Sequence, residues 1–373
     1  MSDLINIDGS QGEGGGQIVR SSLALSMVTG RPVTIDRVRA GRAKPGLKQQ
    51  HLTALRAAQE ICQATVVGDT IGSSSFTFYP GEVVPGNYRF AIGTAGSATL
   101  VLQAILPPLL IADQPSRVIL EGGTHNPWAP PFDFLQRSYL ALVNRMGPRV
   151  TARLEQAGFY PAGGGRFIVE IEPAKRAESL THSSGTPGDL GLSSFHLLER
   201  GEICSQIGRV LLYNLPDHIA DRELEELARL AQWEPDCLFR EHTKARGPGN
   251  AVVIEVVGEH VTEVFIGIGE QGTKAEIVAQ RAFEEMREYL NTDVPVGPHL
   301  ADQLILPMAL SAWQTGTPDH RRQGSFRTVS LTDHSKTQIA VVQAFLATSI
   351  VIEEEGQGDR VVVTIGGKAA GTV

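Results

Sequence analysis

The sequence predicts an α/β fold built from repeated units, and three observations support this prediction. Several segments follow one plan, in which a glycine-rich or polar loop precedes an apolar helix and then a β-branched strand. The 373 residues, 42% of them hydrophobic, can bury a large core and suggest two domains. A Ser-, Thr-, Gly- and Pro-rich stretch at 179–194 separates two textures and is typical of a boundary. We therefore expect each repeat to bury one helical face against a sheet.

Three segments show this plan most clearly. Their loops, helices and strands are GSQGEGGGQ, IVRSSLALSMVTG and PVTIDRV; GTAGSA, TLVLQAILPPLLIA and SRVILEGG; and LTDHSKT, QIAVVQAFLA and TSIVIEEE. A fourth helix candidate, HLADQLILPMALSA, has the same texture but a less clear following strand. The alternative to a true repeat is chance similarity among amphipathic helices.

The middle of the chain differs. It contains the strand RVLLYNL, the charged helix IADRELEELARLAQ, the strands NAVVIEVVG and TEVFIGIG, and a second charged helix, KAEIVAQRAFEEMREYL. We predict a repeat-built catalytic domain of residues 1–183 and 292–373, and a small inserted α/β domain at 184–291.

Composition narrows the classes of function. The net charge of −8 argues against a protein that coats nucleic acid, although seven basic residues and one acid lie between Arg31 and Arg56. The three cysteines are far apart, so no disulfide framework is expected. No stretch approaches the roughly 18 apolar residues of a membrane span, and the N-terminus lacks the pattern of a signal peptide. We expect an intracellular, cytoplasmic protein that does not bind a membrane.

Two loops in the first third of the chain suggest anion binding. The glycine loop at 9–17 fits neither common phosphate-loop pattern, and it is either a flexible turn or a ligand loop to which Glu13 and Arg20 contribute. In the stretch 37–51, Arg39 and Arg42 precede a predicted helix that begins near Gln50 and His51. This stretch is either a solvated basic loop or a phosphate clamp.

Two further stretches leave a choice open. Residues 121–134, EGGTHNPWAPPFDF, contain glycines, prolines and large aromatic residues, and form either a packed corner or one wall of a base-binding pocket. His334 stands in a polar loop before an apolar run, where Thr332 or Asp333 could cap a helix. It is either a helix-start residue or a nucleophile, because a neutral imidazole is available near pH 7.

Taken together, these motifs resemble the RNA 3'-terminal phosphate cyclase family over nearly the whole chain. The fragments are EGGGQIVR, RAGRxxPGLxxQH, EGGTHNPWAPPFDF, FYPAGGG, GPGN, LADQLILPMAL and a late histidine before an apolar helix. The resemblance implies repeated β-α-β-α-β-β units, as in enolpyruvyl transferases, with the small α/β domain inserted between the third unit and the last.

The resemblance also implies an activity. Members convert an RNA 3'-phosphate into a 2',3'-cyclic phosphodiester with ATP, releasing AMP and pyrophosphate, and the matching nucleophile here is His334. Magnesium or manganese is expected with ATP, and RNA with a 3'-phosphate end is the expected partner. The alternatives are a non-catalytic RNA-binding or ribosome-assembly homologue, which lacks this histidine, and an enolpyruvyl transferase. The oligomeric state is left open.

Family residues are carried over position by position. The matching nucleotide and phosphate positions are Glu13, Arg20, Arg39, Arg42, Gln50, His51, Gln103, Pro130, His299, Asp302 and Gln303. Glu13 and Asp302 are the candidates for holding the metal and for orienting His334, with the assignment between them open. His299 departs from the family pattern, in which this position is often aromatic, and Phe265 is a weak candidate for packing on adenine.

Overall fold

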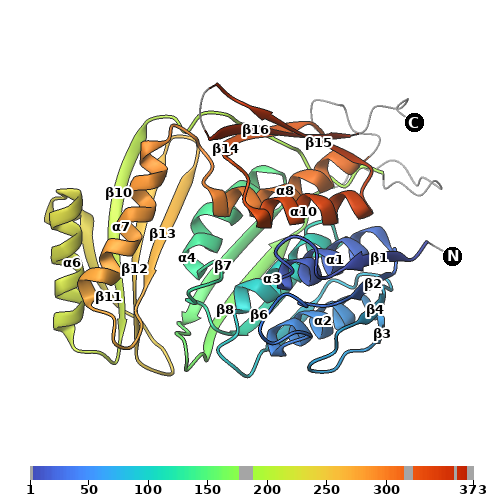
Figure 1. Ribbon diagram of the computed structural model, residues 1–373, viewed down its shortest axis with the longest axis horizontal. Coiled ribbons are helices and arrows are strands. Elements are labelled where there is room, and N and C mark those ends of the chain that lie inside the picture. Colours follow the sequence, from blue (N-terminus) through green and yellow to red (C-terminus); the bar gives the residue numbers. More distant parts are fainter. Residues whose placement is uncertain (1–2, 176–187, 315–321, 357–358, 368–373) are drawn as a thin grey trace.

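The computed structural model describes residues 3–175, 188–314, 322–356 and 359–367. It confirms an α/β fold, with four four-stranded sheets and helices that lie largely between them (Figure 1). No helix in the described ranges is long and apolar enough to cross a membrane. The predicted domain boundary at 183 and 184, and most of the stretch 179–194, lie outside the described residues.

The first repeat forms one complete unit. Its elements are β1 (Ile5–Asp8), α1 (Gly16–Thr29), β2 (Val33–Asp36), α2 (Gln49–Cys62), β3 (Thr65–Val67) and β4 (Phe76–Tyr79). The sheet order is β1-β2-β4-β3, in which β1 and β2 are parallel and β4 is antiparallel to both its neighbours. This is the β-α-β-α-β-β arrangement that the resemblance implies.

The second unit repeats this order as β5-β6-β8-β7. Its elements are β5 (Asn87–Ala91), α3 (Ala98–Leu110), β6 (Ser116–Gly122), α4 (Phe132–Phe134), the π-helix η1 (Leu135–Tyr139), α5 (Leu140–Arg145), β7 (Arg149–Gln156) and β8 (Gly165–Glu172). The short helices α4, η1 and α5 follow one another directly and stand where α2 stands in the first unit.

The third unit has the order β15-β16-β14-β9. Its elements are β9 (His196–Leu197), α8 (Pro298–Trp313), β14 (Gly324–Val329), α10 (Asp333–Phe345), β15 (Thr348–Glu354) and β16 (Arg360–Gly367). The helix with the unclear following strand is therefore α8, and β14 follows it. Because β9 and β14 pair in parallel, the third sheet includes a strand from the far side of the insertion.

The inserted segment forms its own sheet, β11-β10-β12-β13. Its elements are β10 (Ile203–Tyr213), α6 (Asp217–Ala231), η2 (Pro235–Cys237), β11 (Leu238–His242), β12 (Gly249–Gly258), β13 (Thr262–Ile268) and α7 (Ala275–Asn291). The expected position of the insertion, between the third unit and the last, is wrong. Three units are present in the described residues, and the inserted segment interrupts the third between β9 and α8. The strands β9 and β14, on either side of the insertion, still pair with each other.

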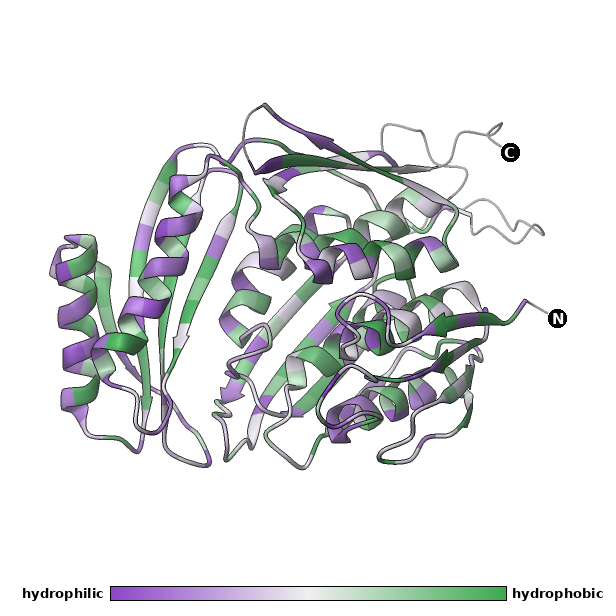
Figure 2. Ribbon diagram, viewed as in Figure 1, coloured by the Kyte–Doolittle hydropathy of each residue, from purple (hydrophilic) through white to green (hydrophobic). Residues whose placement is uncertain are grey.

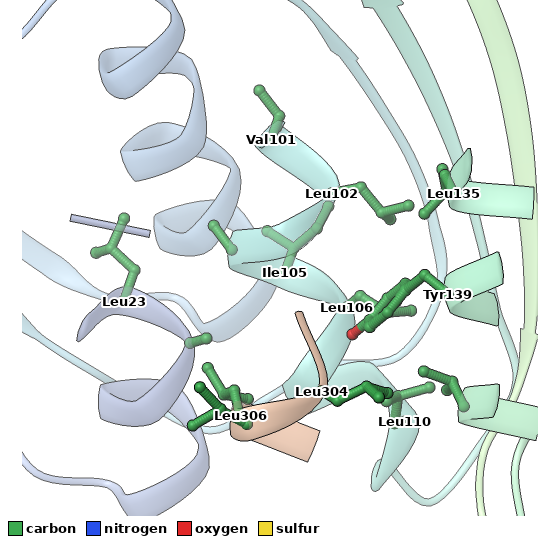
Figure 3. Packing of buried hydrophobic residues seen from close by; sticks show 14 of the residues in the cluster. Leu23, Val101, Leu102, Ile105, Leu106, Leu110, Leu135, Tyr139, Leu304 and Leu306 are labelled. Carbon is green, nitrogen blue, oxygen red and sulfur yellow. The ribbon is translucent and has the colours of Figure 1, made fainter. Parts of the chain in front are cut away.

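The main core lies between the three repeat sheets. There α1 packs against α3 and α10, and α10 against α8. Helix α3 is apolar on almost every side, as expected for a buried helix, and Figure 2 shows the contrast with the mixed faces of α6 and α7. Leu23, Leu106, Tyr139 and Leu304 belong to this core (Figure 3). A second hydrophobic cluster fills the inserted unit.

Candidate active site

His334 lies at the start of α10, where Thr332 is the N-cap and accepts a hydrogen bond from Ser335 N at 3.1 Å. Its imidazole is 51% exposed. Nδ1 lies 2.9 Å from Oε1 of Gln17 on α1. Because an amide oxygen can only accept, Nδ1 must donate, and in the neutral ring the lone pair then lies on Nε2. The helix start therefore presents an accessible imidazole with its tautomer fixed.

The glycine loop brings Glu13 to this imidazole. Glu13 contacts both Nε2 of His334 and the guanidinium of Arg42. Gly12 has a φ of +56°, and a Cβ there would lie 2.1 Å from Thr337 Oγ1, so the loop can approach α10 only with glycine at this position. Glu13 therefore covers Nε2, the nitrogen that carries the lone pair of the neutral ring. Glu13 must therefore find another partner before Nε2 can attack an electrophile.

A chain of amide side chains extends inward from His334. Gln17 Nε2 donates to Asp302 Oδ1 at 2.5 Å, and Gln303 Nε2 donates to Asp302 Oδ2 at 3.0 Å. Gln103 then donates to Gln303 and accepts from Arg20 Nε at 2.9 Å. Helices α1, α3, α8 and α10 thus place their polar side chains in one continuous network.

Burial controls the charges in this network. It lowers the pKa of Arg20 to about 10, with Asp302 and Glu13 acting in the opposite direction. It also raises the pKa of Asp302, although His334, Gln17 and Arg20 favour its carboxylate. The crowded surroundings desolvate the ring of His299 and lower its pKa, and His334 adds to this effect. The charged forms of Arg20 and Asp302 are therefore both disfavoured by burial, and each is stabilised by a nearby group of opposite charge.

A cavity of about 30 Å³ lies within the network. Its lining includes Gln17, Arg20, Asp302, Gln338 and the phenol of Tyr139 from η1. A volume of this size can hold water between the polar side chains.

The basic stretch lies beside the glycine loop, as the clamp hypothesis requires. Arg39 has a φ of +54° and donates to the carbonyls of Lys44 at 2.7 Å and Gly46 at 2.9 Å, so its guanidinium also shapes the loop. His51 is buried in the first turn of α2, and its Nδ1 accepts from Lys48 N at 3.1 Å. Burial and the neighbouring Arg20, Arg39 and Lys48 lower the pKa of His51 to about 3, so the ring is neutral.

The remaining predicted residues lie around this centre. Gln50 accepts from the backbone N–H of Ser97, the N-cap of α3, at 3.2 Å. Pro130 lines a small pocket together with Gln103 and Gln303, while Phe132 and Phe134 of the stretch 121–134 are buried in the core.

Two sequence-based assignments change. Phe265 is not placed to pack on adenine, because it is buried in the inserted unit with its ring centroid 5.4 Å from that of Tyr289. Gln17 was not among the predicted site residues, although it joins His334 to Asp302. The sequence did contain a signal for Gln17, because a polar amide at the start of an apolar helical run is expected to be buried and to need hydrogen-bond partners.

The carboxylates at this site could supply only some of the ligands of a magnesium ion. The described residues contain no group of three or more His, Cys, Asp or Glu side chains suited to a metal ion. Magnesium usually binds one or two carboxylates and takes its other ligands from phosphates and water, so Glu13 on the exposed loop fits this pattern. Both oxygens of Asp302 already accept amide hydrogens, which makes it the poorer ligand.

Comparisons with known proteins all point to one family. A sequence model described as RNA 3'-terminal phosphate cyclase matches residues 11–352. The chain is 46% identical over 363 residues to the RNA 3'-terminal phosphate cyclase of Koribacter versatilis (strain Ellin345), covering 97% of this chain and 95% of the relative. It is also 46% identical over 361 residues to the protein of the same name from Ralstonia nicotianae (strain ATCC BAA-1114 / GMI1000), covering 97% of each.

Proposed function

The chain belongs to the RNA 3'-terminal phosphate cyclase family, and we propose that it converts an RNA 3'-phosphate into a 2',3'-cyclic phosphodiester at the expense of ATP, through an AMP adduct on His334. The single observation that supports this most directly is the half-exposed imidazole of His334, which donates through Nδ1 to Gln17. The other two groups beside it, Glu13 and Arg42, suit a metal ion and a phosphate.

In the first step Nε2 of His334 attacks the α-phosphorus of ATP. A bond between nitrogen and phosphorus forms, the bond to the oxygen that bridges the α- and β-phosphorus breaks, and pyrophosphate leaves with that oxygen. Arg42 and the N-terminus of α10 stabilise the negative charge on the phosphates, since His334 is the second residue of that helix. Gln17 keeps the proton on Nδ1 as positive charge develops on the ring.

In the second step an oxygen of the RNA 3'-phosphate attacks the same phosphorus, and the bond to Nε2 breaks. The imidazole recovers its lone pair, and the RNA end becomes a mixed anhydride with AMP. In the third step the neighbouring 2'-oxygen attacks the RNA phosphorus, its proton passes to solvent, and AMP leaves. Because the attacking group is on the adjacent carbon, positioning accounts for most of the catalysis in this step.

We further propose that Glu13 holds the divalent ion, magnesium or manganese, and that Asp302 acts on His334 through Gln17. A bound ion would offset the charge on the triphosphate. Glu13 would exchange His334 for the ion, which leaves Nε2 free. The two carboxylates would thus have different roles, because Glu13 contacts His334 directly whereas Asp302 contacts Gln17.

The proposal is tested with a short RNA that ends in a 3'-phosphate. We expect ATP-dependent formation of a phosphatase-resistant end, with one AMP and one pyrophosphate released per end. His334→Asn is the informative variant, because its amide can still donate to Gln17 but offers no nucleophilic nitrogen. A wild-type protein that binds this RNA without altering its end would support the non-catalytic homologue instead.

A further inference from the structure

The inserted unit meets the active-site framework where β13 contacts the start of α8. Glu263 on β13 is 3% exposed, and its Oε1 accepts from Gly297 N at 2.6 Å. Gly297 is the N-cap of α8. A Cβ added at Gly297 would lie 3.0 Å from the same oxygen, so the carboxyl group packs directly against the helix start.

The residues just before α8 are held from both sides. Tyr289 of α7 donates its hydroxyl to the carbonyl of Pro295 at 3.0 Å, within the protein interior. The guanidinium of Arg200 lies 4.8 Å from the centre of the Tyr289 ring. On the opposite side, Val296 N donates to the carbonyl of Arg327 on β14 at 3.3 Å. The position of the helix start is thus determined jointly by the inserted unit and the third sheet.

Helix α8 contains three of the predicted site residues in its first two turns, namely His299, Asp302 and Gln303. Asp302 accepts from Gln17, and Gln17 accepts from His334. A displacement of the helix start therefore changes where Asp302 holds the Gln17 amide, and with it the orientation of the imidazole.

We propose that Glu263 is a positioning residue for the adenylylation of His334, through which the inserted unit fixes α8 without touching the substrate. This inference rests on the proposed function, since it concerns the rate of that first step. The contribution of the inserted unit is a buried hydrogen bond to a helix N-terminus.

The chemistry of Glu263 suggests how to separate positioning from simple stability. Burial raises its pKa to about 8, and the hydrogen bond from Gly297 acts in the opposite direction. At neutral pH a carbonyl oxygen of the protonated group accepts from Gly297 N, and glutamine offers the same acceptor without titrating. The elements that pack against β13 carry other titratable groups, among them Glu255 of β12, Glu285 and Tyr289 of α7, Arg137 of η1 and Asp133 of α4, and Arg200 lies against Tyr289.

The same unit offers a matched control. Glu223 on α6 is fully buried, its pKa is also raised to about 8 by burial, and it accepts from Asn250. Asn250 belongs to β12, so this carboxyl group is bonded within the inserted unit rather than to α8. Removing it measures the general effect of losing a buried carboxyl group there.

The experiment measures the single-turnover rate of protein–AMP formation from ATP without RNA, on variants whose circular dichroism matches the wild type. We expect Glu263→Ala to slow this step at least tenfold at pH 7, and Glu263→Gln and Glu223→Ala to stay within threefold of wild type. If Glu263→Ala does not fold, Glu263→Asp replaces it, since it withdraws the carboxyl group from Gly297 by one methylene.

Equal rates for Glu263→Ala and Glu223→Ala would overturn the inference, and so would a Glu263→Gln variant as slow as Glu263→Ala. These results differ from a failure of the proposed function, in which the wild type itself forms no adduct and both proposals fall. A wild type that reacts, with a slow alanine variant that glutamine restores, supports positioning by a hydrogen-bond acceptor at the start of α8.

Discussion

Gln17 Oε1 lies 2.9 Å from Nδ1 of His334, although the two residues are 317 positions apart in the chain. The same side chain donates to Asp302 at 2.5 Å. One amide therefore joins the first unit to both long helices of the third. Because the amide oxygen accepts from Nδ1, the imidazole is held with Nε2 as its reactive nitrogen.

Gln17→Leu removes this hydrogen bond while keeping a side chain of similar size. We expect the rate of protein–AMP formation to fall about 10- to 100-fold, the range found for partners that orient metal-binding histidines, with little change in the KM for ATP. Single-turnover labelling measures the rate. Gln280→Leu on α7, where the amide donates to Glu284, is the control and should react normally. A Gln17→Leu variant at the wild-type rate would contradict the role given to Gln17.

The two carboxylates near His334 should respond differently to metal concentration. In Glu13→Gln we expect adenylylation to slow at least tenfold and to recover partly as magnesium is raised, because the ion loses a ligand. In Asp302→Asn the slowing should not depend on magnesium, since this residue acts through Gln17. A magnesium titration of the single-turnover rate distinguishes them, and the reverse pattern would exchange the two assignments.

Stability should depend on pH through the buried Glu223. Burial raises its pKa from 4.5 to about 8, so the folded protein favours the neutral carboxyl group. The contribution of Glu223 to the free energy of unfolding should be largest below pH 4.5 and should be lost as pH rises to 8, by up to roughly 4 kcal/mol. Urea denaturation at pH 5.5 and 8.5 should show a smaller difference for Glu223→Gln than for wild type. Glu225→Gln, which changes an exposed residue, should show the same difference in unfolding free energy between the two pH values as the wild type. A wild-type difference in Glu223→Gln would contradict the prediction.

RNA binding should depend on the exposed basic loop next to the site. Lys44 and Lys48 are exposed, and the pKa of Lys48 is lowered by desolvation and then by Arg39, Lys44 and Arg42, which indicates a concentration of positive charge. We expect Lys44→Ala to weaken RNA binding and to reduce the slope of log affinity against log salt by about 0.7, the value for one lost contact to a single strand. Fluorescence anisotropy over a salt series measures both quantities.

Lys274→Ala, at the N-cap of α7, is the control for Lys44→Ala. Adduct formation from ATP without RNA should be unchanged in both variants. A Lys44→Ala variant that loses adenylylation but binds RNA normally would assign Lys44 to ATP.

Much of the fold could be predicted because its signals are local. The apolar runs of α1, α3, α8 and α10, and the strands that follow α1, α3 and α10, were predicted from hydrophobic periodicity. The pairing of β9 with β14 could not be predicted this way, because the whole inserted segment and α8 separate the two strands in the sequence. The same limit explains the misplaced insertion, and the division into two domains stays a prediction.

The site was predictable as a set of residues rather than as a geometry. Family motifs named Glu13, Asp302 and His334, but periodicity gives no indication that Gln17 connects two of them. Phe265 illustrates the opposite error, since an aromatic residue in a strand is equally suited to a ligand and to a core, and tertiary packing places it in the core.

The most direct test of the account is the protein–AMP adduct itself. Wild-type protein incubated with ATP labelled at the α-phosphate and a divalent ion should gain one label per chain, in a bond that is acid-labile and alkali-stable. His334→Asn should gain none, and His218→Ala, which removes an exposed histidine of α6, should be labelled like the wild type. A wild-type protein without label, or a His334→Asn protein with it, would contradict the account.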